Sequence, residues 1–215
     1  MTTQAPDRRD APFVAGQTAL LLIDMQRIWL EPGTPAHPDW SPDHYFYRET
    51  AQRAIPNQIK LLQAARAAGV EVLHTIIQSL TVDGRDRSLD HKLTPLHVSP
   101  RDPLGLPVAP LVPADDEILL PKTSSGVFNS TNIHYLLRNL GIQQLVVAGI
   151  MTDQCVDMAV RDGADLGYRV ICVGDACAAK TQERHDNALG AFGGYCWTTN
   201  TGEIVKRFNA LQAAR

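Results

Sequence analysis

The sequence lacks the features that mark membrane, secreted and nucleic-acid-binding proteins. No apolar run approaches the roughly 18 residues of a membrane-spanning helix. The first residues, MTTQAPDRRDAPF, contain no apolar segment of the kind found in a secretory signal. The formal net charge of −3 gives no excess of positive charge for nucleic acid or an anionic membrane. We therefore expect a cytoplasmic protein that binds neither nucleic acid nor membranes.

Cysteine is scarce, and its spacing excludes the common structural zinc sites. The four cysteines, which lie at intervals of 17, 5 and 19 residues, form neither a zinc-ribbon nor a Cys-x-x-Cys pattern. None of the seven histidines is paired at metal-ligand spacing. In the cytosol the thiols are expected to be reduced. The sequence predicts no metal and no cofactor, and three of the cysteines are interpreted as small core residues.

Length and composition indicate one globular domain. The 215 residues, of which 44% are hydrophobic, suffice for a sizeable core, and no linker or internal repeat divides them. We interpret residues 1–215 as a single domain, with residues 1–16 as a flexible arm.

Strands and helices are predicted to alternate along the chain. Buried apolar runs predict five strands, at residues 18–24, 70–77, 117–120, 145–148 and 169–173. Apolar stripes at helical spacing predict helices beginning near Ile55 (with Pro56 in or near the first turn), Ile133, Val156 and Ile204. Three helix–glycine–strand junctions, at Gly69, Gly141 and Gly167, favour right-handed βαβ units. The expected fold is α/β, a three-layer α/β/α doubly wound domain with a mostly parallel sheet.

Two segments do not fit this alternation and are candidates for the walls of a ligand site. Residues 28–48 are rich in proline, tryptophan and tyrosine, and residues 79–114 are charged and then rich in proline. Both follow the carboxyl ends of predicted strands, where open α/β sheets bind ligands.

The turn from Ala148 to Cys155 is a candidate nucleophile site. It joins a buried strand to a helix, with Thr152 or Asp153 as a candidate N-cap. A thiol in the first helical turn is close to free backbone N–H groups, which stabilise a thiolate and can hold an oxyanion. The alternative at this stage is that Cys155 is an inert core residue.

Two charged residues follow other strands at the same predicted edge of the sheet. Asp24 ends the first strand and Lys122 follows the third. Taken singly, each has an ordinary role, as a cap or as a solvated loop residue. Together with Cys155 they supply an acid–base group, a cation and a soft nucleophile, which make a workable hydrolytic site.

The same three segments resemble the cysteine-hydrolase branch of the isochorismatase-like hydrolase family. Asp24 lies in the family's Leu-Ile-Asp-Met-Gln context, and Lys122 follows a proline, as in the family. Cys155 lies in Gly149-Ile-Met-Thr-Asp-Gln-Cys-Val156, which is similar to the family's nucleophile turn. The resemblance extends from about Thr18 to Ile204.

The resemblance implies a mechanism and an oxyanion site. Asp24 would take the thiol proton and return it to the leaving amine, while Lys122 would hold Asp24 and favour the thiolate. Cys155 would form a thioester with the substrate that water then hydrolyses. A cis peptide bond at Ile150–Met151 would aim the backbone N–H groups of Met151 and Cys155 at the oxyanion. A homo-oligomer, a dimer or tetramer, is expected by the same analogy.

Two other activities found in the family fit this sequence less well. Nicotinamidases carry a metal-binding Asp-x-His motif, which occurs nowhere in this sequence, where Asp90 and His91 are adjacent. Isochorismatase proper usually lacks the nucleophilic cysteine. Residues 83–88 and 122–132 look more like the amidohydrolases of biuret and ureidoacrylate and like streptothricin hydrolase. A nicotinamidase-type or isochorismatase-type hydrolase, or a non-catalytic α/β binding protein, remains the alternative.

Four residues are candidates for contacts to a small amide, ureide or lactam substrate. They are Gln78, Arg85, Phe128 and Asn129. Each also has an ordinary interpretation: Arg85 is a solvated loop charge, Phe128 a core residue and Asn129 a helix cap.

Overall fold

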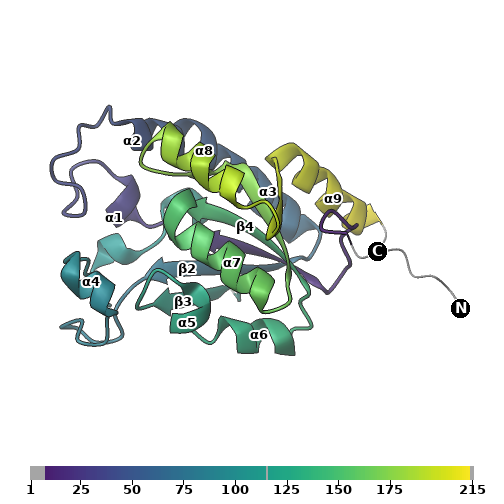
Figure 1. The fold of residues 1–215 in the computed structure, drawn as a ribbon, viewed down its shortest axis with the longest axis horizontal. Helices are drawn as coiled ribbons and strands as arrows, with labels where there is room; N and C mark the ends of the chain where they lie inside the picture. The colour runs from purple at the N-terminus through teal and green to yellow at the C-terminus, as the bar shows by residue number, and fades with distance from the viewer. Residues whose placement is uncertain (1–7, 115, 214–215) are drawn as a thin grey trace, which may run out of the picture.

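The computed structural model describes residues 8–114 and 116–213, which form one parallel sheet with helices on both sides (Figure 1). The six strands are β1 (Thr18–Ile23), β2 (Glu71–Ile77), β3 (Ile118–Lys122), β4 (Gln144–Ile150), β5 (Arg169–Ala178) and β6 (Cys196–Thr199). Their order is β3-β2-β1-β4-β5-β6, and every pair of neighbours is parallel. The predicted doubly wound α/β fold is confirmed.

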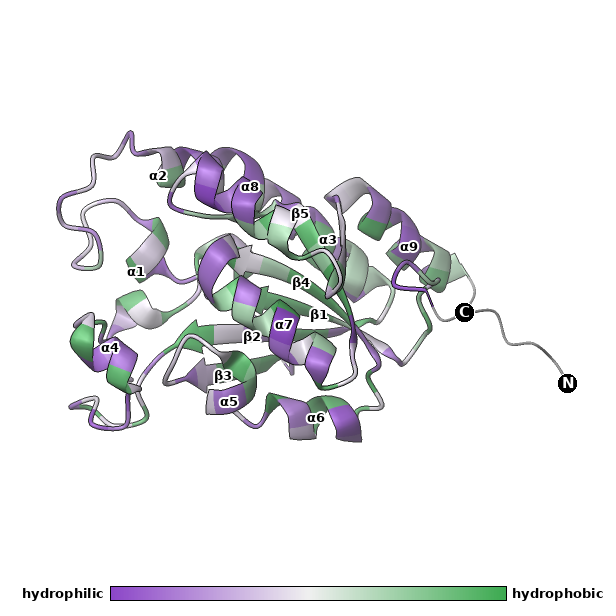
Figure 2. Cartoon of the chain, in the orientation of Figure 1, coloured by the Kyte–Doolittle hydropathy of each residue, from purple (hydrophilic) through white to green (hydrophobic). Residues whose placement is uncertain are grey.

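Helices cover the sheet on two sides. On one side α3 (Ile55–Ala67) packs against α9 (Thr201–Ala213), and on the other α5 (Val127–Ser130) packs against α6 (Ile133–Asn139) and α7 (Asp157–Asp165). The remaining helices are α1 (Arg27–Leu30), α2 (Tyr45–Glu49), α4 (Leu89–Leu93) and α8 (Gln182–Ala191). Figure 2 shows apolar strands inside and polar outward turns on helices such as α7. No helix among the described residues is long and apolar enough to cross a bilayer.

Glycine residues end three of the helices and turn the chain into the next strand. Gly69, Gly141 and Gly167 each come one residue after a helix C-cap and have φ of 59°, 74° and 90°. Glycine adopts this left-handed backbone without a Cβ clash, which ends the helix and turns the chain into the next strand. The three predicted junctions are confirmed.

The predicted strand limits were wrong in two places, and one strand was missed. Lys122 is the last residue of β3 rather than a residue after it, and β5 continues to Ala178 instead of ending at Val173. Strand β6 was missed because it is short and partly exposed, so its apolar pattern is weak. Pro56 lies in the first turn of α3 as predicted, after a π-helical turn at Thr50–Ala54.

A bulge in β5 explains why its end was misplaced. The register shifts between the pairs Val147–Cys172 and Gly149–Cys177, so β5 has extra residues there. The carbonyls of Gly174, Asp175 and Ala176 accept hydrogen bonds from Arg53, Asn57 and Gln58 respectively. After the bulge, β5 pairs with β4 again and ends at the same edge of the sheet.

The expected flexible arm lies partly outside the described residues, which begin at residue 8. Within the described part, Phe13 is buried and its ring lies 5.5 Å from that of Phe208. Arg207 also donates hydrogen bonds to the carbonyls of Asp10 and Ala11. This stretch is therefore held against the core.

Candidate active site

The strand order places the three candidate catalytic residues at one edge of the sheet. The chain leaves β1 toward β2 on one side and β4 toward β5 on the other, so β1 and β4 form the topological switch point. Asp24 follows β1, Cys155 follows β4, and Lys122 ends β3. Side chains that are distant in the sequence can meet here.

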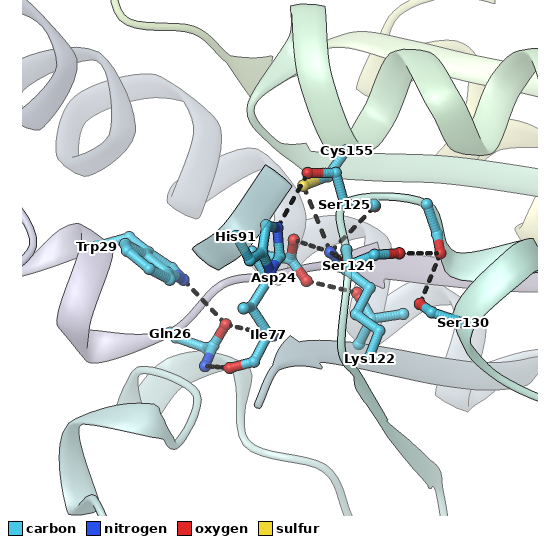
Figure 3. A network of polar contacts seen from close by, with 12 residues as sticks. Asp24, Gln26, Trp29, Ile77, His91, Lys122, Ser124, Ser125, Ser130 and Cys155 are labelled. Atoms are coloured by element: carbon cyan, nitrogen blue, oxygen red, sulfur yellow. Dashed lines mark hydrogen bonds and ion pairs between the residues drawn. The ribbon is translucent and has the colours of Figure 1, made fainter. Parts of the chain in front are cut away.

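Lys122 connects the other two residues (Figure 3). Its Nζ atom lies 2.8 Å from Asp24 Oδ2 and 3.4 Å from Cys155 Sγ, and it donates to the carbonyls of Ser124 and Ser125 at 3.1 Å each. Lys122 is 0% exposed, Asp24 1% and Cys155 5%. An ammonium buried this deeply needs such a full set of acceptors. The structure thus brings the predicted triad together.

The Asp24 carboxylate is held from a second side. The Asp24 N–H donates to the carbonyl of Thr75 at 3.1 Å, and Thr75 Oγ1 donates to Asp24 Oδ1 at 2.8 Å. The backbone of Asp24 has φ of 57°, a left-handed conformation that aspartate tolerates better than most residues. This turn directs the carboxylate to Lys122.

The nucleophile lies in a π-helical turn, Thr152–Val156, that precedes α7. The predicted N-cap was wrong: Met151 precedes the turn and no side chain caps it, because Thr152 and Asp153 are engaged elsewhere. Thr152 Oγ1 lies 2.8 Å from Nδ1 of the buried His185, and Asp153 forms an ion pair with Arg184. Both partners belong to α8, which thus holds the turn from outside.

The approach of β4 to β1 depends on Gly149. Its φ is 139°, and a Cβ atom built there would lie 2.3 Å from the carbonyl oxygen of Ile23. Only glycine allows the two strands this contact just before Asp24 and the nucleophile turn. The next peptide bond but one, Ile150–Met151, is cis, as the family resemblance implied.

Burial and the Lys122 ammonium act in opposite directions on the Cys155 thiol. Burial raises the pKa of the Cys155 thiol to about 12; the Lys122 ammonium opposes this shift and the Asp24 carboxylate adds to it. Burial alone would lower the pKa of Lys122, but Asp24 and Cys155 beside it raise it. Burial therefore disfavours the thiolate of Cys155, while the Lys122 ammonium favours it.

A cavity of about 380 Å³ opens above these residues. It is lined by Asp24, Trp29, His37, Trp40, Ile77, Leu96, Ile150, Met151, Gln154, Cys155, Lys180 and Arg184. The two irregular segments contribute walls as expected, through Trp29, His37 and Trp40 from the first and Leu96 from the second. The tyrosines of the first segment do not line it.

A second cavity, of about 690 Å³, lies at the opposite ends of the strands. It is lined by residues such as Arg8, Arg138 and Arg169, and none of its lining residues is a cysteine or a serine. Although larger, it contains none of Asp24, Lys122 and Cys155, so the smaller cavity is the candidate active site.

None of the four predicted substrate-contact residues lines the smaller cavity. Gln78 is half-buried and its backbone N–H donates to the carbonyl of Lys122, while Arg85 is exposed and pairs with Asp83. The Phe128 ring stacks with that of Tyr168 at 5.8 Å, and Asn129 accepts a hydrogen bond from Ser124. The structure therefore assigns these side chains to loop and core contacts.

Sequence reasoning missed the polar residues around the cavity. Lys180 and Arg184 were not predicted because the predicted fifth strand ended too early, at Val173. A strand that ends at Ala178 places Lys180 at the same edge of the sheet as Cys155. Outside the cavity lining, sequence reasoning also missed the contact of His91, whose Nε2 lies 3.2 Å from Ser125 Oγ (Figure 3). No group of three His, Cys, Asp or Glu side chains suited to a metal ion occurs among residues 8–114 and 116–213.

Comparison with known families matches residues 18–203 to the isochorismatase domain. This match confirms the resemblance seen in the three motifs. The solved structure of a cysteine hydrolase from Pseudomonas syringae pv. phaseolicola 1448A is similar, with a TM-score of 0.82 and 26% identity, over 94% of this chain and 96% of that one.

Three curated relatives carry functional names. Ureidoacrylate amidohydrolase RutB of Serratia proteamaculans is 31% identical over 193 residues, which cover 82% of this chain and 76% of that protein. N-carbamoylsarcosine amidase of Arthrobacter sp. is 27% identical over 202 residues, covering 90% and 72%. The probable inactive nicotinamidase At3g16190 of Arabidopsis thaliana is 30% identical over 175 residues, covering 78% and 84%.

Proposed function

This chain belongs to the isochorismatase family, and on that basis we propose that it is a cysteine-dependent amidohydrolase. It cleaves a C–N bond of a small amide, ureide or lactam through a thioester intermediate. One observation carries the proposal: Lys122 holds both Asp24 and Cys155 at the wall of a cavity large enough for such a substrate.

The first half of the reaction begins from the protonated thiol. Asp24 accepts the proton as the sulfur attacks the carbonyl carbon, so a free thiolate need not accumulate in a site where burial disfavours it. The negative charge moves from the carboxylate to the substrate oxygen, which the backbone N–H groups of Met151 and Cys155 receive. Lys122 keeps its charge throughout and balances each of these states.

The second half releases both products. Asp24 returns its proton to the leaving nitrogen as the C–N bond breaks, which leaves an acyl or carbamoyl thioester on Cys155. Water then attacks the thioester with Asp24 as the base, and the thiol recovers its proton as the acid product departs. No group outside Asp24, Lys122, Cys155, the two amides and water is needed.

The names of two relatives support this reaction class, because the Serratia protein is named an amidohydrolase and the Arthrobacter protein an amidase. A second candidate is a nicotinamidase-type hydrolase, because the Arabidopsis relative is named a probable inactive nicotinamidase. The absence of an Asp-x-His motif speaks against it. Ammonia release from nicotinamide separates the two.

The test is a kinetic comparison of Cys155→Ala with the wild type on biuret, ureidoacrylate, N-carbamoyl amino acids, nicotinamide and cyclic lactams. We expect the variant to lose a factor of roughly 10³ or more in kcat, because the covalent route is removed. Cys196→Ala is the matched control, since that thiol is also buried but lies in β6. Unchanged turnover in a folded Cys155→Ala protein would overturn the proposal.

The expected cytoplasmic location and homo-oligomeric assembly remain predictions of the sequence and the family resemblance. Sedimentation of the purified protein measures the assembly directly.

A further inference from the structure

We infer that the substrate carries a carboxylate, which Lys180 binds at the rim of the cavity with help from Arg184. The inference rests on the proposed function, because it describes the part of the substrate that does not react. It names the substrate class as amido or ureido acids.

The backbone places Lys180 beside the nucleophile. Ala178, the last residue of β5, pairs with Ile150 of β4, and the buried Ala179 follows. Lys180 is therefore next to the turn that carries Cys155, while Arg184 lies in the first full turn of α8. Both side chains line the same cavity as Asp24 and Cys155.

The charges around the cavity do not balance. Lys122 is paired with Asp24, and Arg184 with Asp153. Lys180 is exposed and makes no ion pair within residues 8–114 and 116–213; its ammonium lies 5.2 Å from the centroid of the Trp40 ring. Asp24 is the only carboxylate in the lining, so one positive charge faces the cavity unneutralised. A monoanionic ligand group would supply the missing charge.

The neighbouring imidazoles do not change this balance near neutral pH. Burial lowers the pKa of His37 to about 4, and the positive charge of Lys180 adds to the shift. Burial and Lys180 also lower the pKa of His44. These two rings therefore add no positive charge to the cavity near neutral pH.

The shape of the wall suits a flat, short molecule. Trp29, His37 and Trp40 present planar rings, and the Nε2 atom of His37 is buried with no hydrogen-bond partner among the described residues. A ureido or amide group can stack on such rings and pair with that nitrogen. At about 380 Å³ the cavity lies near the lower end of the range for small-molecule sites.

The test compares substrates that differ only in the carboxylate. N-carbamoylglycine and N-ethylurea form one pair, and succinamate and butyramide form another. We expect kcat/KM of the wild type to favour the acid of each pair, and Lys180→Met to lower kcat/KM for the acids by about 10- to 100-fold, mainly through KM. The neutral partners should change by less than about threefold. Lys180→Arg should restore the preference, and Lys206→Met, which removes an exposed lysine of α9, should leave it intact.

The outcomes separate this inference from the proposed function. Two results overturn the carboxylate assignment alone. One is turnover that needs Cys155 but shows no preference for the acids. The other is an equal loss of kcat/KM on both members of a pair in Lys180→Met. If no amide is hydrolysed, the proposed function fails, and binding of maleate by calorimetry decides the inference. Binding by the wild type that Lys180→Met weakens supports it, and equal or absent binding overturns it.

Discussion

The floor and the rim of the cavity differ in burial and in how their charges are paired. The floor, which we define as Asp24, Lys122 and Cys155, is buried, and each charge in it has a partner at hydrogen-bond or ion-pair distance. The rim, which we define as His37, Trp40, Lys180 and Arg184, is half-buried or exposed and is held by ring contacts and one surface ion pair.

The difference assigns separate tasks to the two regions. Buried charges cannot move without a large loss of free energy, so the floor keeps one geometry suited to a fixed reaction. Rim side chains can change with little effect on folding, so they can select the substrate. Changes to the floor should therefore reduce both stability and kcat, whereas changes to the rim should act mainly on KM.

The largest effect is expected when the buried ion pair is broken. Lys122→Met leaves Asp24 buried without its cation, and we expect a loss of about 3–5 kcal/mol in the free energy of unfolding. Activity should fall by roughly 10³-fold or more, because the charge of Asp24 is no longer balanced. Urea unfolding and ammonia release measure the two losses.

A double variant tests the cause of this loss. Asp24→Asn with Lys122→Met removes both charges, so it should be more stable than Lys122→Met alone while remaining inactive. Additive losses of stability would show that the two side chains are not coupled, and the floor would not be a unit.

A steric change next to the floor, in β4, should rank second. Gly149→Ala places a Cβ atom 2.3 Å from the carbonyl of Ile23 at φ of 139°, and we expect a loss of about 3 kcal/mol or more. The matched control is Gly33→Ala near the rim, which has φ of 79° and no atom within 4 Å, with an expected loss of about 1–2 kcal/mol. Thermal unfolding compares them; equal losses would contradict the tight contact between β1 and β4.

The floor and the rim should also differ in how pH affects them. With a Cys155 pKa of about 12, alkylation by iodoacetamide should be slow at pH 7 and rise about tenfold per pH unit to pH 10. The folded pKa lies above the unfolded value of 9.0, so this group's stabilisation is complete below pH 9 and lost as the pH rises toward 12. His37 changes charge only near pH 4. Neither group therefore titrates between pH 6 and 8.

Mass spectrometry identifies the alkylated residue, with Cys155→Ala as the blank. A rate that levels off near neutral pH would show a thiolate already formed in the free protein and would confirm the expectation from the sequence.

The floor could be predicted from the sequence because its residues end strands. A buried run such as 18–24 identifies both the strand and the residue at its end, and parallel strands bring their ends together. The resemblance to a family then supplied the roles of Asp24, Lys122 and Cys155, and the structure places them in contact.

The rim could not be predicted because it depends on a bulge and on irregular segments. Lys180 was hidden by the extra residues of β5 between Cys172 and Cys177, which no periodic pattern reveals. His37 and Trp40 are placed by stacking within residues 28–48, where no strand or helix sets the spacing. Phe128, which was a candidate substrate contact, is half-buried and packs against Tyr168 outside the cavity.

The smallest expected effect belongs to the rim and tests whether Trp40 positions Lys180. Trp40 stacks on His37 with ring centroids 3.7 Å apart and on His44 at 4.1 Å, and it faces the Lys180 ammonium. Trp40→Phe keeps a stacking ring but weakens the attraction of the cation, which at an exposed site contributes about 0.5–1 kcal/mol. KM for N-carbamoylglycine should therefore rise about two- to fivefold, with kcat and the melting temperature nearly unchanged.

Trp197→Phe is the matched control, because Trp197 lies in β6, outside the cavity, with its ring 4.1 Å from the guanidinium of Arg207. A fall in kcat without a change in KM would instead show that Trp40 acts on the chemical step, as the residues of the floor do.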